Sequence, residues 1–299
     1  AVANANAVHT KAERYVGQEE TLWNLIPTQE LPRSITVGWR LDPEAYTCRY
    51  CRCDLRAKYG LYSWLIDALN DPWKIQCPDC RRKFPSNDFG KFYESGIDEH
   101  GFWSYEKAKA NGQEYLTNIL YPEKGEGWGV DDGWGYLTGK TWTDGSRSGP
   151  EAHSYIAYYH HWGIWHNPNG LVQNALENCS QAYLYTGDIR YGRVAAIVAD
   201  RVADIYPTMY TEPYYPAFFP NWKRGKAVDM TWECAGSKNL VRSYDKVYDV
   251  YDDPYVVNFL AEKAEKYHME NTKTSPALIR ENCENGILRE VLKAAQEGN

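Results

Sequence analysis

Apolar residues recur at helical spacing throughout the second half of the chain. A first stripe ends at Gly187, and a second stripe begins after Asp188. The first consists of Leu171, Ala175, Leu176, Cys179 and Tyr183, and the second of Val194, Val198, Val202 and Ile205. Because only a short link joins the two stripes, they predict an αα-hairpin.

Capping signals mark the starts of further helices. Asp253, followed by proline, begins a segment that we expect to be helical to about Glu270. Ser275 and Asn167 are also followed by proline, and this pairing is typical of a helix start because Asn, Asp and Ser favour the N-cap and Pro the first turn. The helical pattern also recurs over 234–251. No alternating apolar run is long enough for a large sheet, so the sequence predicts a mainly α fold.

The first half of the chain is less regular. Residues 1–40 form an N-terminal segment that we expect to be loosely structured, with a short helix over 21–26. Residues 41–299 form the main domain. Within it, 55–70 is predicted to be one helix, because its apolar positions fit a helical period: Leu61, Trp64, Leu65 and Leu69.

A glycine-rich loop occupies residues 121–150. It contains eight glycines, several acidic residues and the tryptophans Trp128, Trp134 and Trp142. A loop this long within a compact chain is usually functional or disordered, and the tryptophans argue against disorder. We interpret the loop as a lid or cleft wall for an extended ligand, with a purely structural Ω-loop as the alternative.

Two Cys-x-x-Cys knuckles define a candidate metal module at 48–90. They consist of Cys48 with Cys51 and of Cys77 with Cys80. Two such knuckles supply a closed shell of four thiolates with no open position, which is typical of structural Zn²⁺. A disulfide network is the rival interpretation. Cys53 is surplus to the shell, and the isolated thiols of Cys179, Cys234 and Cys283 are expected to be buried as small hydrophobes.

The charge balance argues against nucleic acid as a partner. The 299 residues carry 33 basic and 40 acidic side chains, for a net charge of −7. A local basic cluster on the knuckles is therefore interpreted as a solvated face rather than a phosphate-binding surface: Arg49, Arg52, Arg56, Arg81, Arg82 and Lys83. No apolar run is long enough to span a bilayer, and no signal peptide is evident, so an export signal would have been removed.

Aromatic residues are abundant and suggest carbohydrate as a ligand. Trp, Tyr and Phe make up 15% of the chain. Such rings stack on sugar faces while the polar tips of Tyr and Trp bind hydroxyl groups, although an aromatic-rich core explains many of them.

Histidines and cations near the helical hairpin supply candidate chemistry. His166 and Asn167 lie at the mouth of the hairpin and can contact a carboxylate, with a packed ring and a helix cap as the alternatives. His153 can line the same groove. The adjacent His160 and His161 are interpreted as core residues rather than metal ligands. Arg242 and Lys238 suit a carboxylate or sulfate, or an ion pair with Asp245 or Asp249.

Several segments resemble a known family. They are CPDCRRKFPSNDFG at 77–90, YPEKGEGWGVDDGWG at 121–135, YIAYYHHWG at 155–163, and 169–188. Together they are similar to the bacterial heparinase II/III-like polysaccharide lyases. The resemblance implies an incomplete (α/α) toroid that continues into a β-sandwich domain, an anionic polysaccharide such as a glycosaminoglycan as substrate, and a periplasmic or secreted location.

The resemblance also implies β-elimination of uronic-acid-containing glycans. That chemistry requires a group that neutralises the C5 carboxylate, a base for the C5 proton and an acid for the C4 oxygen. The family's Asn, His and Tyr motif has no match here, so we expect the chain to be a toroid portion whose main catalytic set lies beyond Asn299. The candidates within the chain are His166, Asn167 and His153 for catalysis and Trp128, Trp134, Tyr158, Trp162 and Arg242 for substrate binding.

Two other functions stay open. A glycoside hydrolase on a helical toroid would need two carboxylates facing one cleft, for which Asp131 or Asp132 with Glu233 are conceivable. A non-catalytic carbohydrate-binding module would need neither carboxylate pair nor base. Formation of an unsaturated uronyl product distinguishes a lyase from both.

Overall fold

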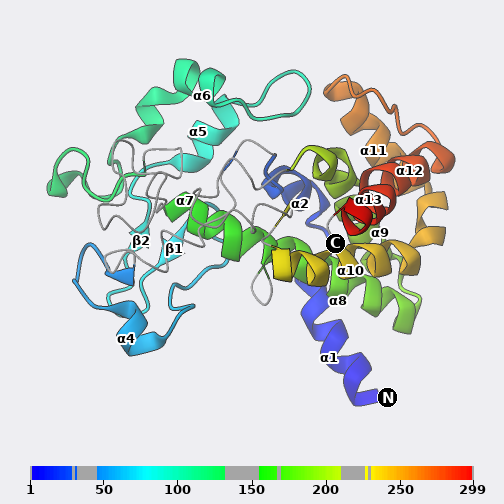
Figure 1. Ribbon diagram of the computed structural model, residues 1–299, viewed down its shortest axis with the longest axis horizontal. Helices are drawn as coiled ribbons and strands as arrows, with labels where there is room; N and C mark the ends of the chain where they lie inside the picture. The colour runs from blue at the N-terminus through cyan, green and yellow to red at the C-terminus, as the bar shows by residue number, and fades with distance from the viewer. Residues whose placement is uncertain are drawn as a thin grey trace.

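The chain folds into a mainly helical structure with one small sheet (Figure 1). The computed structural model describes residues 2–28, 31, 46–131, 155–166, 170–209, 226–227 and 230–297. In Figure 1, the metal module and its neighbouring helices lie on the left, and a body of longer helices lies on the right. No helix among the described residues has the length and apolarity needed to cross a bilayer.

Helix α9 (Ile189–Ile205) forms the centre of the helical body. Most of its side chains are buried, including Val194, Val198, Val202 and Ile205 of the predicted stripe. Helix α8 (Leu171–Thr186) packs along it as the predicted αα-hairpin. Gly187 ends α8 with a φ of 69°, a conformation that strongly favours glycine, and the Asp188 carboxylate caps α9 by accepting from Arg190 N.

The hairpin begins later than the sequence predicts. Helix α8 starts at Leu171 after Gly170, whereas Asn167 and its proline, the predicted cap, lie outside the described residues. Gly170 N donates to His166 O at 2.7 Å, and a Cβ at Gly170 would lie 2.7 Å from that same oxygen. The tight turn at Gly170 therefore sets the start of the helix.

The other helices of the body surround the α8–α9 hairpin. Helices α11 (Pro254–Lys266) and α12 (Pro276–Cys283) begin as predicted, capped by Asp253 and Ser275, although α11 ends four residues before Glu270. The remaining elements of this part are α1 (Val2–Glu13), α2 (Glu19–Leu25), η5 (Tyr206–Thr208), α10 (Met230–Lys246), η8 (Tyr248–Asp252), the π-helical η9 (Glu284–Arg289) and α13 (Glu290–Glu297).

The N-terminal segment is part of this body rather than a loose appendage. Helix α1 packs on α8, and α2 packs on α9. Ala12, Tyr15, Leu22 and Trp23 are almost fully buried. The prediction of a loosely structured segment is therefore wrong for residues 2–28, because their apolar side chains complete the core of the hairpin.

The predicted helix over 55–70 is also wrong beyond its first turn. Helix α4 (Leu55–Tyr59) ends at Gly60, whose φ is 87°. The chain then extends, and Leu65 exchanges backbone hydrogen bonds of 2.9 and 2.8 Å with Gln76. Trp64 is buried, while Leu61 and Leu65 are exposed. Trp64 and Leu69 are buried from an irregular segment at the edge of the sheet, which replaces the expected apolar helix face.

Short elements make up the rest of the metal-module half. Strands β1 (Ile75–Gln76) and β2 (Lys83–Phe84) pair antiparallel, with Ile75 opposite Phe84. The helices are α5 (Phe89–Ser95), α6 (Tyr105–Gly112), η2 (Gln113–Leu116), η3 (Pro122–Lys124), α7 (Tyr155–Tyr158) and the π-helical η4 (Tyr159–Trp165). Of the glycine-rich loop, residues 121–131 are described, and Asp132, Trp134 and Trp142 lie outside the described residues.

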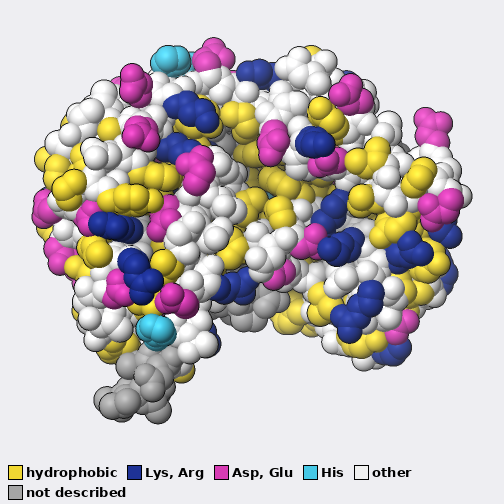
Figure 2. Space-filling model, turned by 180° about the vertical axis from the view of Figure 1, so that it is seen from behind, with side chains coloured by type: hydrophobic (Ala, Val, Ile, Leu, Met, Phe, Trp, Pro, Cys, Tyr) yellow, Lys and Arg dark blue, Asp and Glu magenta, His cyan; other side chains and the backbone are white. Residues whose placement is uncertain are grey.

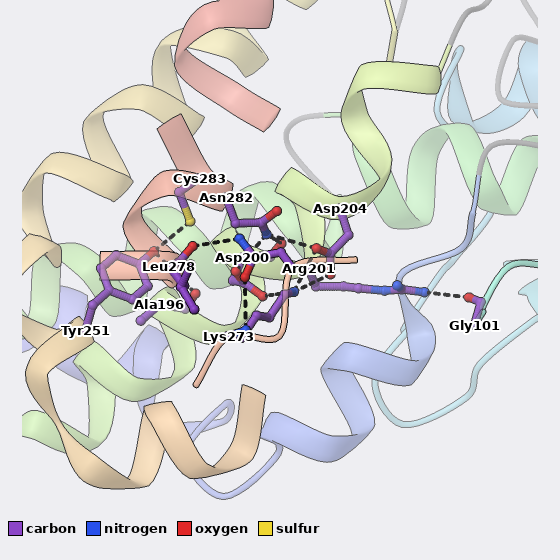
Figure 3. A network of polar contacts seen from close by, with 11 residues as sticks. Gly101, Ala196, Asp200, Arg201, Asp204, Tyr251, Lys273, Leu278, Asn282 and Cys283 are labelled. Atoms are coloured by element: carbon purple, nitrogen blue, oxygen red, sulfur yellow. Dashed lines mark hydrogen bonds and ion pairs between the residues drawn. The ribbon is translucent and has the colours of Figure 1, made fainter. Parts of the chain in front are cut away.

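A buried ionic network joins α9 to the segments around it (Figure 3). Lys273 is fully buried and binds both Asp200 and, at 2.7 Å, Asp204. Asn282 of α12 donates to the same two carboxylates at 2.8 and 2.9 Å. Because buried charges are tolerated only when they are paired and hydrogen-bonded, the loop before α12 is fixed against α9.

Arg201 is a second buried charged residue of α9, and its side chain points away from Lys273 towards Gly101 (Figure 3). Arg201 donates to Gly101 O at 3.2 Å, and its guanidinium carbon lies 4.0 Å from the centre of the Trp23 ring. Its Nε and Nη1 find no hydrogen-bond acceptor among the described residues, so the ring supplies the remaining stabilisation. Arg201 thus links α9 to α2 and to the loop ahead of α6.

Replacing Lys273 by methionine should lower the free energy of unfolding by about 3–5 kcal/mol, because two carboxylates would stay buried without their counter-ion. Urea denaturation followed by circular dichroism measures the loss. Lys293→Met, which changes an exposed lysine of α13, is the matched control and should alter the free energy by less than about 0.5 kcal/mol. Equal values for the two variants would contradict the assignment of Lys273 to the core network.

Candidate metal centre and cationic pocket

Four cysteines converge on one point in the metal module. The sulfur atoms of Cys48, Cys51, Cys77 and Cys80 all lie within 4.8 Å of one another. Cys48 Sγ is 3.6 Å from Cys80 Sγ, and Cys51 Sγ is 3.9 Å from Cys77 Sγ. Sulfurs in a disulfide are about 2.05 Å apart, whereas thiolates about 2.3 Å from a tetrahedral Zn²⁺ stand about 3.8 Å apart. The cysteines are free, and their spacing fits a metal ion rather than disulfides.

The two knuckles share one backbone design. In the first, Arg52 N donates to Cys48 O at 2.9 Å; in the second, Arg81 N donates to Cys77 O at 3.0 Å. Both arginines take a left-handed conformation, with φ values of 59° and 64°. Because such values are uncommon outside glycine, their repetition indicates two equivalent turns that direct all four thiols inward.

Metal binding must displace protons from two of these thiols. Burial raises the pKa of Cys77 to about 11 and raises the pKa of Cys48 further. These thiols therefore hold their protons at neutral pH unless a metal ion displaces them.

The other cysteines are separate from the cluster. Cys53 is half-buried and is not among the four grouped thiols, as predicted. Cys179 and Cys283 are fully buried, also as predicted. Cys234 is exposed, so the prediction of a buried thiol is wrong there, because that position faces outward on α10.

Hydrogen bonds tie the metal module to the start of the glycine-rich loop and to α7. Ser86 N donates to Gly129 O at 2.8 Å, and Asn87 Nδ2 donates to Asp131 O at 3.4 Å. The buried Asp131 carboxylate accepts from Ile156 N at 2.9 Å and so caps α7. These contacts place the module beside η4, which continues from α7.

A separate pocket of about 360 Å³ lies between the end of η4, α8 and α10. Lys238, Arg242 and Lys246, spaced four residues apart, line it from α10. Among the described residues, no carboxylate oxygen lies within 4.0 Å of any of the three. Burial lowers the pKa of Lys246; the carboxylates of Glu177 and Asp245 oppose this shift, and the charge of Arg242 adds to it. The pocket therefore concentrates positive charge.

The alternative ion pairs for Arg242 do not form among the described residues. Asp249 instead accepts from Tyr183 Oη at 2.8 Å. The polar groups that face the three cations from α8 are Gln173, Glu177 and Gln181. Glu177 balances part of the charge, and the pocket keeps a cationic excess next to amide donors.

The structure brings two predicted site residues together and separates others. His166 and Arg242 line the same pocket. Trp162 lies beneath His166, with ring centres 4.2 Å apart. Tyr158 is only 1% exposed, which places it in the core rather than at a substrate surface, because its aromatic stripe packs inward. Asn167, His153 and Trp134 lie outside the described residues.

Trp128 lies on the metal module rather than in the pocket. Its ring packs 5.7 Å from Phe84 and 5.4 Å from Tyr121. The adjacent histidines are core residues, as expected: His160 and His161 are at most 3% exposed, and Trp165 Nε1 donates to His160 Nε2 at 3.1 Å.

Sequence reasoning missed part of the pocket. Lys246, Gln173 and Trp165 were not among the candidates, although a spacing of four residues from Arg242 to Lys246 is visible in the sequence.

Comparisons with protein-family models, curated proteins and solved structures returned no match.

Metal removal should destabilise the fold. Cys51→Ser should reduce bound metal from about one ion per chain to near zero and lower the melting temperature by about 5–10 °C, because the ligand shell stabilises only the folded state. Elemental analysis and thermal unfolding measure the two effects. Cys53→Ser, two residues away, is the control and should keep its metal; equal metal loss in both variants would contradict the assignment of the four ligands.

Proposed function

We propose that the chain is the helical portion of a polysaccharide lyase that acts on uronic-acid-containing anionic glycans. The single observation that carries the proposal is the cationic pocket beside His166, in which three α10 cations lack a carboxylate partner among the described residues. The resemblance of four sequence segments to heparinase II/III-like lyases supports the same reaction. In this proposal the described helices belong to an incomplete (α/α) toroid, joined to a β-sandwich domain and acting in the periplasm or outside the cell.

The metal in this proposal is a structural Zn²⁺. Four thiolates complete a tetrahedral shell, which leaves no position for a water or a substrate. The separation of 3.6 and 3.9 Å between opposing sulfurs suits that ion. The reaction is therefore assigned to the pocket and not to the metal.

The pocket suits the first requirement of β-elimination. Arg242 can hold a C5 carboxylate through two parallel hydrogen bonds, and Lys238 and Lys246 add positive charge. When a base removes the C5 proton, negative charge builds up on that carboxylate, and these cations stabilise it. The electron pair of the C5–H bond then forms the C4–C5 double bond, the C4–O bond breaks, and the leaving oxygen takes a proton.

His166 is the proposed proton-transfer group within the described pocket. It lies at the end of η4, where the chain turns into α8 through Gly170. Trp162 and His161 pack against its ring, with centres 4.2 and 5.1 Å away, which fixes its orientation. An imidazole held in one orientation beside the substrate can transfer a proton as a general base or acid.

One observation favours a non-catalytic glycan-binding module as the second candidate. His166 is only 3% exposed, so little of its ring reaches the pocket. The cations would bind an acidic sugar equally well without any proton transfer. The hydrolase alternative has less support, because Asp131 caps α7 and Glu233 accepts from Tyr206 Oη at 2.7 Å and Ala227 N at 3.1 Å.

Ultraviolet absorbance tests the proposal directly. A purified protein that contains this chain together with the proposed β-sandwich domain should release unsaturated uronyl products from at least one uronate polysaccharide. In that protein, Arg242→Ala should lower kcat/KM by about 100-fold or more, the usual effect of removing one charge-stabilising donor. Arg289→Ala, an exposed arginine of η9, should leave kcat/KM unchanged.

The other outcomes separate the candidates. New reducing ends without absorbance would indicate a hydrolase. Binding of the acidic glycan without either product would indicate a binding module, and loss of activity in Arg289→Ala to the same degree would contradict a specific role for Arg242.

A further inference from the structure

A second group of cations lies on the metal module, outside the pocket. Arg82 lies between two rings, with its guanidinium carbon 4.3 Å from the centre of Tyr50 and 4.6 Å from that of Tyr121. Lys124 Nζ lies 4.6 Å from the centre of Tyr50 and 5.9 Å from that of Trp128. We call Tyr50, Arg82, Tyr121, Lys124 and Trp128 the aromatic–cation cluster.

The metal knuckles hold this cluster in place. Tyr50 lies inside the first knuckle, and Arg82 follows the second. The turn that carries Tyr121 is closed by Asn118, whose side chain accepts from Tyr121 N at 3.1 Å and donates to Tyr121 O at 2.9 Å. Trp128 packs edge-on to Tyr50 and Tyr121, with ring centres 6.2 and 5.4 Å away. The cations are therefore presented on a preorganised surface.

The positive charges of the cluster are available to an anionic ligand. Among the described residues, no carboxylate oxygen lies within 4.0 Å of Arg82 or Lys124, although Glu123 and Glu126 are close in sequence. Neighbouring lysines differ: Lys83 is paired with Asp71 at 2.9 Å. Figure 2 shows Lys and Arg side chains gathered over the metal-module half of the molecule, which lies on the right in that view.

The arrangement of the rings selects the kind of ligand. Single-stranded nucleic acids bind such surfaces by stacking bases on open aromatic faces. Here cations lie against Tyr50 and Tyr121, so these rings support the cations instead of offering a stacking platform. The hydroxyl groups of Tyr50 and Tyr121 engage part of the Arg82 guanidinium, and a guanidinium has five N–H donors, so donors remain for a carboxylate or sulfate. The chemistry fits the acidic groups of a polysaccharide.

We propose that the aromatic–cation cluster is a second binding surface for an acidic polysaccharide chain, separate from the cationic pocket. It rests on the proposed function only for the identity of the glycan. A chain long enough to reach both surfaces binds more tightly than a short oligosaccharide, because the second contact becomes intramolecular.

Binding of long polymers tests the surface separately from catalysis. We compare heparin and hyaluronan, which carry sulfate with carboxylate and carboxylate alone, in an Arg242→Ala background, in which cleavage and binding in the pocket are both weakened. Adding Arg82→Ala or Lys124→Ala should weaken binding of at least one polymer by about tenfold at low salt. Lys109→Ala, an exposed lysine whose Nζ lies 5.8 Å from the Tyr105 ring centre, should leave it unchanged.

Activity and metal content supply the decisive controls. In the otherwise native protein, Lys124→Ala should leave kcat/KM for a short oligosaccharide and the bound metal unchanged. Unaltered polymer binding in both Arg82→Ala and Lys124→Ala would overturn the proposal, as would tighter Arg82-dependent binding of oligothymidylate than of either glycan. Cluster-dependent glycan binding without any unsaturated product would support this surface while refuting the lyase function.

Discussion

The need to neutralise two opposite charges inside one buried helix organises the helical body. Asp200 and Arg201 are adjacent in α9, and both are almost completely buried. Adjacent residues of a helix point in different directions, so their partners come from different parts of the chain. Asp200 meets Lys273 and Asn282 from the C-terminal helices, and Arg201 meets α2 and the loop ahead of α6. This arrangement fixes α9 against both halves of the molecule.

The pocket is a consequence of that arrangement. Helix α8 is held on α9, and α10 packs on α8. Gln173 on α8 faces Asn239 on α10, whose amide donates to the Gln173 side chain at 2.7 Å. The spacing of four residues then places Lys238, Arg242 and Lys246 on one side of α10. Their mutual repulsion is acceptable at an open surface and is relieved when an anion binds.

The metal module supports the pocket through packed aromatic rings. Phe84, next to the second knuckle, stacks on Tyr155 of α7 with ring centres 5.0 Å apart. Trp73 contacts Tyr159 of η4 at 5.4 Å. Helix α7 and η4 lead directly to Trp165 and His166 at the pocket. A continuous set of side-chain contacts thus connects the four cysteines with the proposed site, which agrees with a structural role for the metal.

Local chemistry explains which features could be predicted from sequence. The caps at Asp188, Asp253 and Ser275 and the stop at Gly187 depend on neighbouring residues only, and they were confirmed. The grouping of the four cysteines could also be predicted, because it depends on the short spacing within each Cys-x-x-Cys knuckle. The end of α4 at Gly60 was not predicted, because the helical spacing of apolar residues continues past it in the sequence. Trp64 instead packs against the rings of Phe84 and Tyr155, which are distant in sequence.

Tertiary contacts explain what sequence reasoning missed. The pocket arises where α8 meets α10, and these helices are separated by more than forty residues of sequence. The ionic network needs Lys273 to cross to α9 from a loop in which its φ is 52°. Trp128 was predicted for a cleft wall, yet it packs on the metal module because Phe84 and Tyr121 offer it an aromatic surface.

Calorimetric titration with a uronate oligosaccharide and with its carboxyl-reduced, neutral counterpart is the most direct measurement of whether this protein recognises acidic glycans through its unpaired cations. The two ligands have the same rings and hydroxyl groups and differ only in the charge that the pocket would meet. The uronate form should bind at least about tenfold more tightly, with the difference shrinking as salt is raised. Equal affinity for the two forms would contradict recognition of the sugar acid by the cationic pocket.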